Sequence, residues 1–328
     1  MSTTPANLLD LDYRRPPAFR PAGLGLTDCH THLRGDEESL RMYFEAATLY
    51  GVEHVLSMTA WSGTEIIRRL YGPRVEFIAV PDFRQWNRSD EFQQSWVRDI
   101  ERFAASGSRL CKFWAAPRAL AEHGLTLADP WLRPMIDAAL AGRMAFMVHV
   151  GDPDLWFATR YADAATFGTK VGAFEQLRWF LDRVAPRPVI GAHFIGNPED
   201  LDHLDSLLQT YPHLMLDTSA TKWVARETSR HERDRVRRFF ARHQQRILFG
   251  SDLVLGPNYN FDHYASRYWV QRTLWETDYD GDSPIQDPDV IGRVRLRGAN
   301  LPDDCLRAIY HDNYARLVER IDAMRNTP

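Results

Sequence analysis

The sequence predicts an α/β protein, a (β/α)8 barrel of the TIM-barrel kind with an N-terminal arm and a C-terminal helical extension. Short apolar runs alternate with longer stretches of helical periodicity along most of the 328 residues. This alternation is typical of parallel strands that are joined by helical crossovers. Eight such runs can be distinguished, and eight strand–helix units suit a chain of this length.

Each apolar run has the length of a buried strand. A doubly wound open sheet would give a similar alternation. However, no Gly-x-Gly-x-x-Gly motif follows the first run, which argues against dinucleotide binding. The expected strands cover residues 26–30, 52–58, 75–80, 109–114, 145–150, 188–193, 214–219 and 246–251.

Capping residues mark the ends of the expected helices. Serine, aspartate and asparagine favour the N-cap, proline favours the first helical position, and glycine favours the C-terminal end. The expected helices are 36–51, which ends at Gly51; 89–107, after a Ser89 cap; 129–142, with Asp129 and Pro130; 197–209, with Asn197 and Pro198; and the charged segment 229–243.

The pattern predicts one domain with a leader. Residues 1–24 are rich in proline and arginine and read as an arm, and residues 25–328 form a single barrel domain. An aromatic-rich insertion at 256–300 follows the eighth strand. A role as a lid or pocket wall explains it as well as a role as a dimer contact does. Its acidic stretch 278–289 reads as a solvated loop, and a closing helix follows at about 302–323.

The composition favours a soluble, cytoplasmic protein. Hydrophobic residues make up 44% of the chain, the net charge is −4, and no stretch is apolar enough for a membrane span. The basic residues are scattered, which argues against a nucleic-acid partner. We therefore expect a small-molecule substrate and no membrane partner, with a homodimer left open.

Cys29, Cys111 and Cys305 are too few and too widely spaced for a disulfide framework, and the first two are expected to be packing thiols.

Metal-binding side chains follow successive expected strands. In a barrel of this kind, chemistry takes place at the C-terminal ends of the strands. A single histidine in such a position is more often an ordinary buried residue. A metal centre is favoured because several metal-binding side chains fall at the same end of successive strands. Residues i and i+2 of a strand share a face, so two histidines with this spacing can converge on one ion. The strand-end residues are His30, His32, Lys112, His149, His193 and Asp252.

These motifs resemble those of the amidohydrolase superfamily, in its amidohydrolase-2 or carboxymuconate-semialdehyde-decarboxylase-like branch. The stretches TDCHTHL, MVHVGD, VIGAHF, ILFGSD and HDNYARLV carry the resemblance, which spans about residues 26–320. The resemblance implies a mononuclear centre held by His30, His32, His149 and Asp252, with His193 orienting the attacked group or the water. If Lys112 is carboxylated, it would bridge two ions, with His149 and His193 on the second. Asn313 is expected to be structural.

The resemblance also implies the chemistry. We expect a hydrolase in which metal-activated water attacks an amide or lactone, with Asp252 moving the proton and His193 polarising the carbonyl. Zinc best suits the nitrogen and oxygen ligands, and manganese is the alternative metal. The alternative reaction is non-hydrolytic decarboxylation of an aromatic or unsaturated acid. A non-catalytic barrel is disfavoured because the ligand set is complete.

Cationic and indole side chains beyond the strand ends predict a small anionic substrate. An ordinary loop role is at least as common for each of them taken singly. The expected substrate-binding residues are Arg84, Trp114, Arg118, Lys222 and Trp223, with Trp86 and Arg226 as further candidates.

Overall fold

The computed structural model describes residues 5–34 and 36–326. Contacts divide the chain into two compact units, and each is described by itself. The first unit consists of residues 1–57 and 218–314, and the second of residues 58–217 and 315–328.

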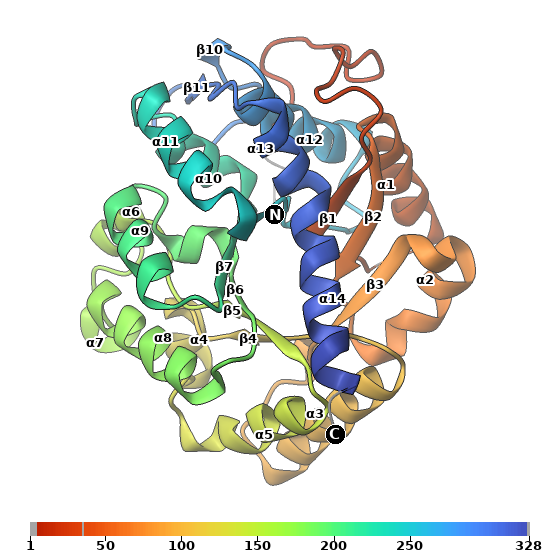
Figure 1. The fold of residues 1–328 in the computed structure, drawn as a ribbon, viewed down its shortest axis with the longest axis vertical. Coiled ribbons are helices and arrows are strands. Elements are labelled where there is room, and N and C mark those ends of the chain that lie inside the picture. The colour runs from red at the N-terminus through yellow and green to blue at the C-terminus, as the bar shows by residue number, and fades with distance from the viewer. Residues whose placement is uncertain (1–4, 35, 327–328) are drawn as a thin grey trace. The chain divides into compact units, whose positions relative to one another are not determined.

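The first unit contains three hydrogen-bonded parallel strands in the order β2–β1–β9, followed along the chain by a small antiparallel hairpin. Helix α1 begins after an Asp36 cap and ends before Gly51, as predicted. It packs beside α12 (Figure 1). The strands are β1 (Leu26–His32), β2 (Val52–Ser57), β8 (Ile247–Leu248), β9 (Leu253–Val254), β10 (Asp280–Asp282) and β11 (Arg295–Arg297). The helices are α1 (Glu37–Leu49), α10 (Thr221–Thr228), α11 (Arg233–His243), α12 (Phe261–Glu276) and α13 (Asp303–Arg307), with a π-helical turn at Ala308–Asp312.

The second unit is built on five parallel strands in sequential order, β3–β4–β5–β6–β7. Consecutive strands are joined by helical crossovers, as the alternation predicted (Figure 1). The strands are β3 (Val75–Ala79), β4 (Leu110–Trp114), β5 (Ala145–His149), β6 (Val189–Gly191) and β7 (Leu214–Asp217). The helices are α2 (Thr64–Tyr71), α3 (Asp90–Ala105), α4 (Pro117–His123), α5 (Arg133–Ala141), α6 (Asp154–Ala158), α7 (Ala164–Phe167), α8 (Lys170–Val184), α9 (Leu201–Thr210) and α14 (Asn313–Asn326), which starts in the first unit.

All eight expected strands are present, and most caps are confirmed. Ser89 caps α3, and Asp129 accepts a hydrogen bond from the backbone at the start of its 3-10 turn. The Asn197 cap was wrong: α9 begins at Leu201, and Asp200 is its N-cap. The Asn197 side chain instead pairs with the ring of His203 in the first turn of α9 at 3.0 Å, so this local contact takes the place of the cap.

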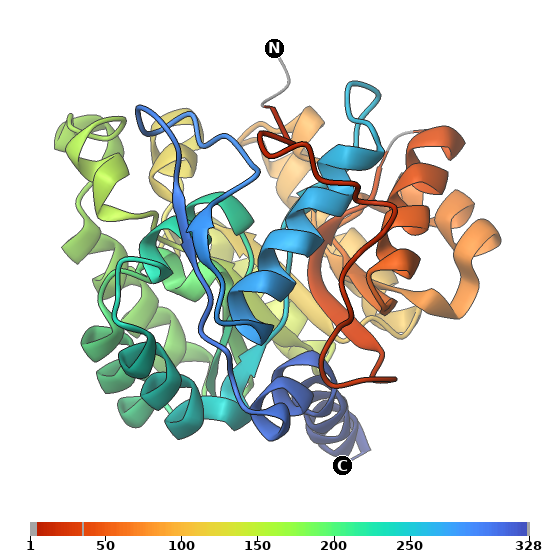
Figure 2. The same cartoon turned by 90° about the horizontal axis from the view of Figure 1, so that it is seen from above.

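The N-terminal arm is part of the first unit. Figure 2 shows the arm, in red, running along α12. The backbone N–H of Arg20 donates to Glu276 at 2.7 Å, and its guanidinium donates to Asn300 at 2.7 Å. The guanidinium of Arg272 also stacks on the ring of Phe19 at 3.7 Å. These contacts bind the arm to the insertion.

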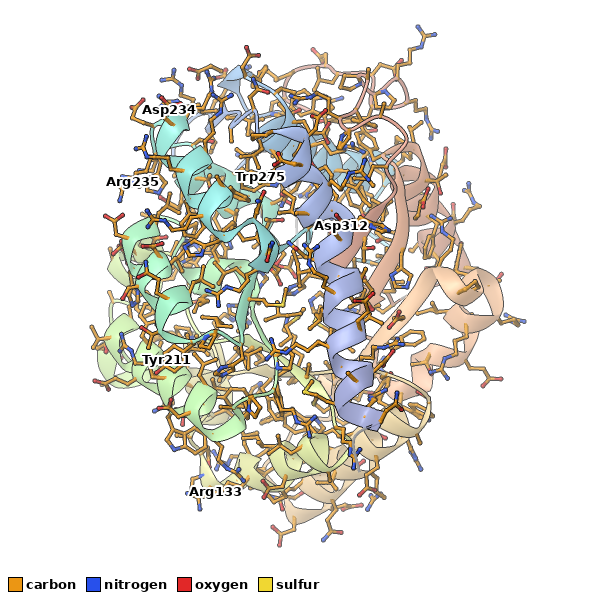
Figure 3. The ribbon with its side chains drawn as sticks, viewed as in Figure 1. Arg133, Tyr211, Asp234, Arg235, Trp275 and Asp312 are labelled. Atoms are coloured by element: carbon orange, nitrogen blue, oxygen red, sulfur yellow. The ribbon has the colours of Figure 1, made fainter. Side chains whose placement is uncertain are left out.

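The insertion at 256–300 is largely core. Tyr268 and Trp275 of α12 are fully buried, and the indole of Trp275, which is labelled in Figure 3, packs against Phe240. On neighbouring α11, by contrast, Asp234 is exposed. The prediction of a solvated acidic loop was wrong in part, because Asp287 is 1% exposed and its charge is neutralised by Arg226.

Polar residues of the remaining motifs have structural roles. Asn313 donates to the carbonyls of Gln244 and Ile247, both at 2.6 Å, and so holds the start of β8. Cys29 and Cys111 are buried thiols, as predicted, and burial raises the pKa of Cys111. In the described ranges, no helix has both the length and the apolar character that a membrane crossing needs.

Candidate metal centre

His30, His32 and Asp252 bring three ligand atoms together in the first unit. Oδ1 of Asp252 lies 3.4 Å from Nε2 of His30 and 3.2 Å from Nε2 of His32. The three atoms lie within 4.8 Å of one another. Ligand atoms bound to one tetrahedral ion at about 2.1 Å lie about 3.4 Å apart. This donor set therefore fits a single divalent cation.

The backbone explains why these side chains converge. His30 and His32 lie two residues apart on β1, so both imidazoles project to one face. After β8 the chain turns through Asp252, whose φ is +59°, and its N–H donates to the carbonyl of His30 at 2.8 Å. The next residues form β9 and pair with β1, with Leu253 opposite Thr31. Asp252 is thus held beside the strand that carries both histidines.

Two buried residues that sequence reasoning missed support this group. The hydroxyl of Ser219 lies 3.0 Å from Nδ1 of His30, which leaves Nε2 directed at Asp252. Metal-binding histidines typically have such a partner on the other ring nitrogen. Asp28, two residues before His30, accepts hydrogen bonds from the backbone of His30 and from both polar groups of Ser251. Burial raises the pKa of Asp28 to about 7, although these hydrogen bonds act to lower it.

In the second unit, His149 and His193 lie together. Their ring centroids are 4.6 Å apart, and the rings are nearly perpendicular. Nε2 of His149 lies 3.1 Å from Asp152, whose other oxygen accepts from Tyr161 at 3.0 Å. Asp152 was missed, although it belongs to the quoted motif MVHVGD. Lys112, on β4 of the same unit, is buried.

His193 sits in a left-handed turn directly after β6. His193, Phe194 and Ile195 have φ values of +57°, +51° and +59°. Such backbone costs energy for residues other than glycine and is concentrated at functional sites. The turn closes at Gly196, where a Cβ would lie 2.0 Å from the carbonyl oxygen of Gly151. The backbone N–H of His193 donates to Asp217 at 2.8 Å, which fixes the turn against β7.

The predicted substrate-binding residues have varied surroundings. Arg84 is exposed and ion-pairs with Asp82. Arg118 ion-pairs with Glu122, one helical turn away. The indole of Trp114 packs against Phe83 and His123, Lys222 is half-buried at the start of α10, and Trp223 beside it is buried. Arg226 is buried in ion pairs with Glu227 and Asp287. Substrate binding by these residues stays a prediction.

Comparison with known proteins places the fold. No protein-family model matches the chain, and no curated protein does. Among solved structures, 5-carboxyvanillate decarboxylase from Sphingomonas paucimobilis is 12% identical with a TM-score of 0.50, over 90% of this chain and 99% of that one. The hydratase for 4-oxalomesaconate from Rhodopseudomonas palustris is 12% identical with a TM-score of 0.50, over 91% and 97%. A putative amidohydrolase from Staphylococcus aureus is 11% identical with a TM-score of 0.53, over 90% and 100%.

These similarities extend over nearly the whole of each chain, and at this level of identity they bear on the fold alone. They agree with the alternating strands and helices and with the parallel pairing within each unit. The chain therefore has the α/β-barrel fold of these solved structures, the fold class that its sequence predicted.

Proposed function

We propose that the chain is a metal-dependent hydrolase that acts on an amide or lactone bond of a small anionic substrate. The convergence of His30, His32 and Asp252 supports the proposal most strongly. The His30 side chain is fully buried, whereas 25% of His32 and 29% of Asp252 are exposed. Three protein ligands with one accessible side are typical of a catalytic rather than a structural metal site.

The residues of this group have separate tasks. His30 and His32 hold the cation, for which zinc suits the donors best and manganese is the alternative. A divalent ion bound there acts as a Lewis acid and lowers the pKa of water. Asp252 faces both imidazoles through Oδ1, and we assign to its carboxylate the transfer of the proton to the leaving group.

The remaining roles are assigned to residues of the second unit. Asp152 orients His149 through Nε2, which leaves Nδ1 as the atom for its proposed role as a further ligand. His193 is assigned the polarisation of the carbonyl. Lys112 would become a ligand only when carboxylated, and one ion per chain is the favoured stoichiometry.

Metal analysis tests the proposal. Purified protein that is loaded with zinc and dialysed should retain about one ion per chain, and His30→Ala and His32→Ala should each lose it. His311→Ala, which changes an exposed histidine, is the matched control. Equal zinc content in all four proteins would refute the metal centre.

A second experiment separates the two reactions. Metal-loaded protein is assayed against a panel of amides and lactones, and separately for carbon dioxide release from aromatic and unsaturated acids. Hydrolysis that disappears in Asp252→Asn supports the hydrolase. Release of carbon dioxide without hydrolysis would replace it with the decarboxylase.

A further inference from the structure

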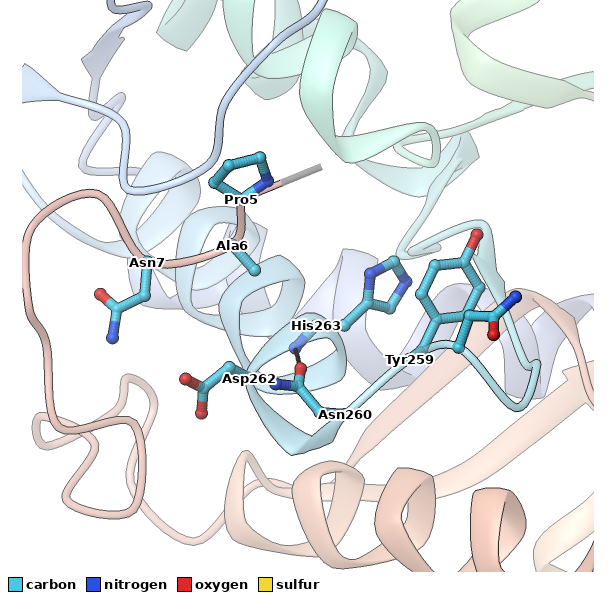
Figure 4. A pocket seen from close by; sticks show the side chains of 8 residues that line it. Pro5, Ala6, Asn7, Tyr259, Asn260, Asp262 and His263 are labelled. Atoms are coloured by element: carbon cyan, nitrogen blue, oxygen red, sulfur yellow. Dashed lines mark hydrogen bonds between the residues drawn. The ribbon is translucent and has the colours of Figure 1, made fainter. Parts of the chain in front are cut away.

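A cavity of about 320 Å³ lies in the first unit, between the N-terminal arm and the start of α12. Its wall includes Ala6 and Asn7 of the arm and Tyr259, Asp262 and His263 at the start of α12 (Figure 4). The volume lies in the range of small-molecule sites. In Figure 4, Tyr259 and His263 lie on one side of the cavity and Asp262 on the other, so the two sides differ chemically.

Behind the first side lies a buried cation, Arg267, which is 6% exposed. Its Nη1 donates to the carbonyl of His263 and to the hydroxyl of Ser266, both at 3.0 Å. Among the described residues, no carboxylate lies within ion-pair distance of it. Burial lowers the pKa of Arg267 to about 10. A guanidinium that is buried without an anion is costly, because it loses its hydration and gains no counter-charge.

Arg267 does not line the cavity itself, and its hydrogen bond to the carbonyl of His263 places it directly behind a lining residue. Its charge acts on Tyr259 and on Tyr13. Tyr259 lines the cavity, and the hydroxyl of Tyr13 donates to the carbonyl of Ala6, which lines it too, at 2.7 Å. His263, one helical turn before Arg267, also lines the cavity and stacks on Tyr259 at 3.8 Å between ring centroids.

The ring of His263 is a neutral partner on the same side. Burial, Arg267 and Lys222 together lower its pKa to about 2, so the imidazole is uncharged at neutral pH. A neutral imidazole offers one N–H donor and one acceptor. No described residue hydrogen-bonds to its ring nitrogens. One buried cation, Arg267, and an imidazole whose ring nitrogens have no described partner therefore lie on this side of the cavity.

Asp262 gives the other side the opposite character. It precedes Arg267 by five residues, so the two side chains project about 140° apart around α12. This separation explains why the carboxylate and the guanidinium do not pair with each other. No ion pair with Asp262 exists among the described residues. A ligand with an anionic end and a hydrogen-bond donor would suit both sides of the cavity: the anionic end would face His263 and the donor would face Asp262.

We propose that this cavity binds a small organic acid that carries a hydroxyl group, with its carboxylate accepting from the ring of His263, on the side behind which Arg267 is buried, and its hydroxyl donating to Asp262. None of the residues that line the cavity belongs to the group formed by His30, His32 and Asp252. The inference does not rest on the proposed hydrolase activity, because a chain without a metal would bind the acid equally well.

Calorimetric titration with 4-hydroxybenzoate tests the site. The protein is the full chain carrying His30→Ala and treated with a chelator, so that the metal group cannot bind the carboxylate. We expect saturable binding, weakened about tenfold or more by Arg267→Met and less by Arg267→Lys, which keeps the charge. Arg15→Met, which changes an exposed arginine of the arm, is the matched control and should bind normally.

The hydroxyl and the acidic side have their own test. Benzoate lacks the hydroxyl and should bind more weakly than 4-hydroxybenzoate, and Asp262→Asn should reduce that difference. 4-Hydroxybenzamide, which lacks the charge, should not bind. Binding that survives Arg267→Met unchanged, or absence of binding at millimolar concentrations of 4-hydroxybenzoate and of glycolate, would overturn the proposal.

Thermal unfolding shows whether Arg267→Met loses binding only because it is misfolded. Because Arg267 has no anionic partner in the free protein, Arg267→Met should be at least as stable to heat as the parent in ligand-free buffer. The parent should gain thermal stability with 4-hydroxybenzoate, and the variant should not. If Arg267→Met unfolds at markedly lower temperature without ligand, Arg267 is a structural residue and the proposal is wrong.

Discussion

Ser251 is bound twice to Asp28: its hydroxyl donates to Oδ2 at 2.6 Å, and its backbone N–H donates to Oδ1 at 3.0 Å. Asp28 also accepts from the backbone of His30 at 3.2 Å and from the hydroxyl of Tyr268 at 2.9 Å. Ser251 immediately precedes Asp252. One buried carboxylate thus links the two segments that supply the candidate metal ligands.

Removing the Ser251 hydroxyl should destabilise the protein. Ser251→Ala leaves a buried carboxylate oxygen short of one donor, so the free energy of unfolding should fall by about 1–3 kcal/mol. Asp28→Asn should cost less than Asp28→Ala, because its amide can still donate to the hydroxyls of Ser251 and Tyr268. Urea unfolding at pH 7 measures all three. Equal losses for the two Asp28 variants would contradict this account.

Ser251 and Tyr268 should also be coupled in stability, because both donate to Oδ2 of Asp28. In a double-mutant cycle, Ser251→Ala and Tyr268→Phe should show an interaction energy above about 0.5 kcal/mol. Tyr211→Phe, which changes a partly exposed tyrosine on the surface (Figure 3), should instead be additive with Ser251→Ala. Additivity in both cycles would mean that Asp28 does not connect the two hydroxyls.

Gly196 should tolerate no side chain, because a Cβ there would meet the carbonyl of Gly151. Gly196→Ala should lower the free energy of unfolding by about 3 kcal/mol or more, since backbone has to move. Gly107→Ala is the matched control: its φ is also positive, +93°, but nothing lies within 4 Å of its Cβ position. It should cost only about 1 kcal/mol of backbone strain. Similar unfolding free energies for the two variants would show that the turn after β6 can relax.

The sequence was sufficient for the strands and for the residues at their ends. His30 and His32 could be paired because the period of a strand is two, and Asp252 because it follows the last apolar run. The two-residue period of the strand also pointed to Asp28, which was not singled out from the sequence. Asp28 lies two residues before His30 and therefore on the face that both histidines share, and a carboxylate at that place in an apolar run requires partners.

Other features depend on contacts between distant segments. Ser219 lies 189 residues from His30 in the chain, so no local pattern links them. The Asn197 cap failed for a local reason instead: its side chain binds the ring of His203, six residues on, and Asp200 caps the helix. The helix α12 buries both Tyr268 and Val270, which project about 200° apart around the helix, so it lacks the apolar stripe by which a surface helix is recognised.

His263 should make the protein sensitive to acid. Burial, assisted by Arg267 and Lys222, lowers its pKa from 6.5 to about 2 in the folded state. The unfolded chain therefore binds the proton first. The stability that this group contributes is complete above about pH 6.5 and is lost as the pH falls toward 2, at up to about 1.4 kcal/mol per pH unit.

Urea unfolding at pH 7 and pH 5 measures this contribution. His263→Gln should lose less stability than the parent between the two pH values, because its side chain cannot take up a proton. His311→Gln, at an exposed position, should behave like the parent. An unchanged pH dependence in His263→Gln would show that the folded protein accommodates the imidazolium.

The buried ion cluster around Arg226 should respond unequally to the loss of its members. Arg226 binds Asp287 and, at 2.7 Å, Glu227, and Asp289 lies 3.7 Å away. Arg226→Met leaves these carboxylates buried together and should lower the free energy of unfolding by about 3–5 kcal/mol. Asp287→Asn should cost less, because Glu227 still neutralises the guanidinium. Arg230→Met removes only an exposed partner of Glu227 and should stay within about 1 kcal/mol of the parent. Urea unfolding measures all three variants. If Arg226→Met and Asp287→Asn lose the same free energy of unfolding, the single pair of Arg226 and Asp287, and not the cluster, holds the insertion to α10.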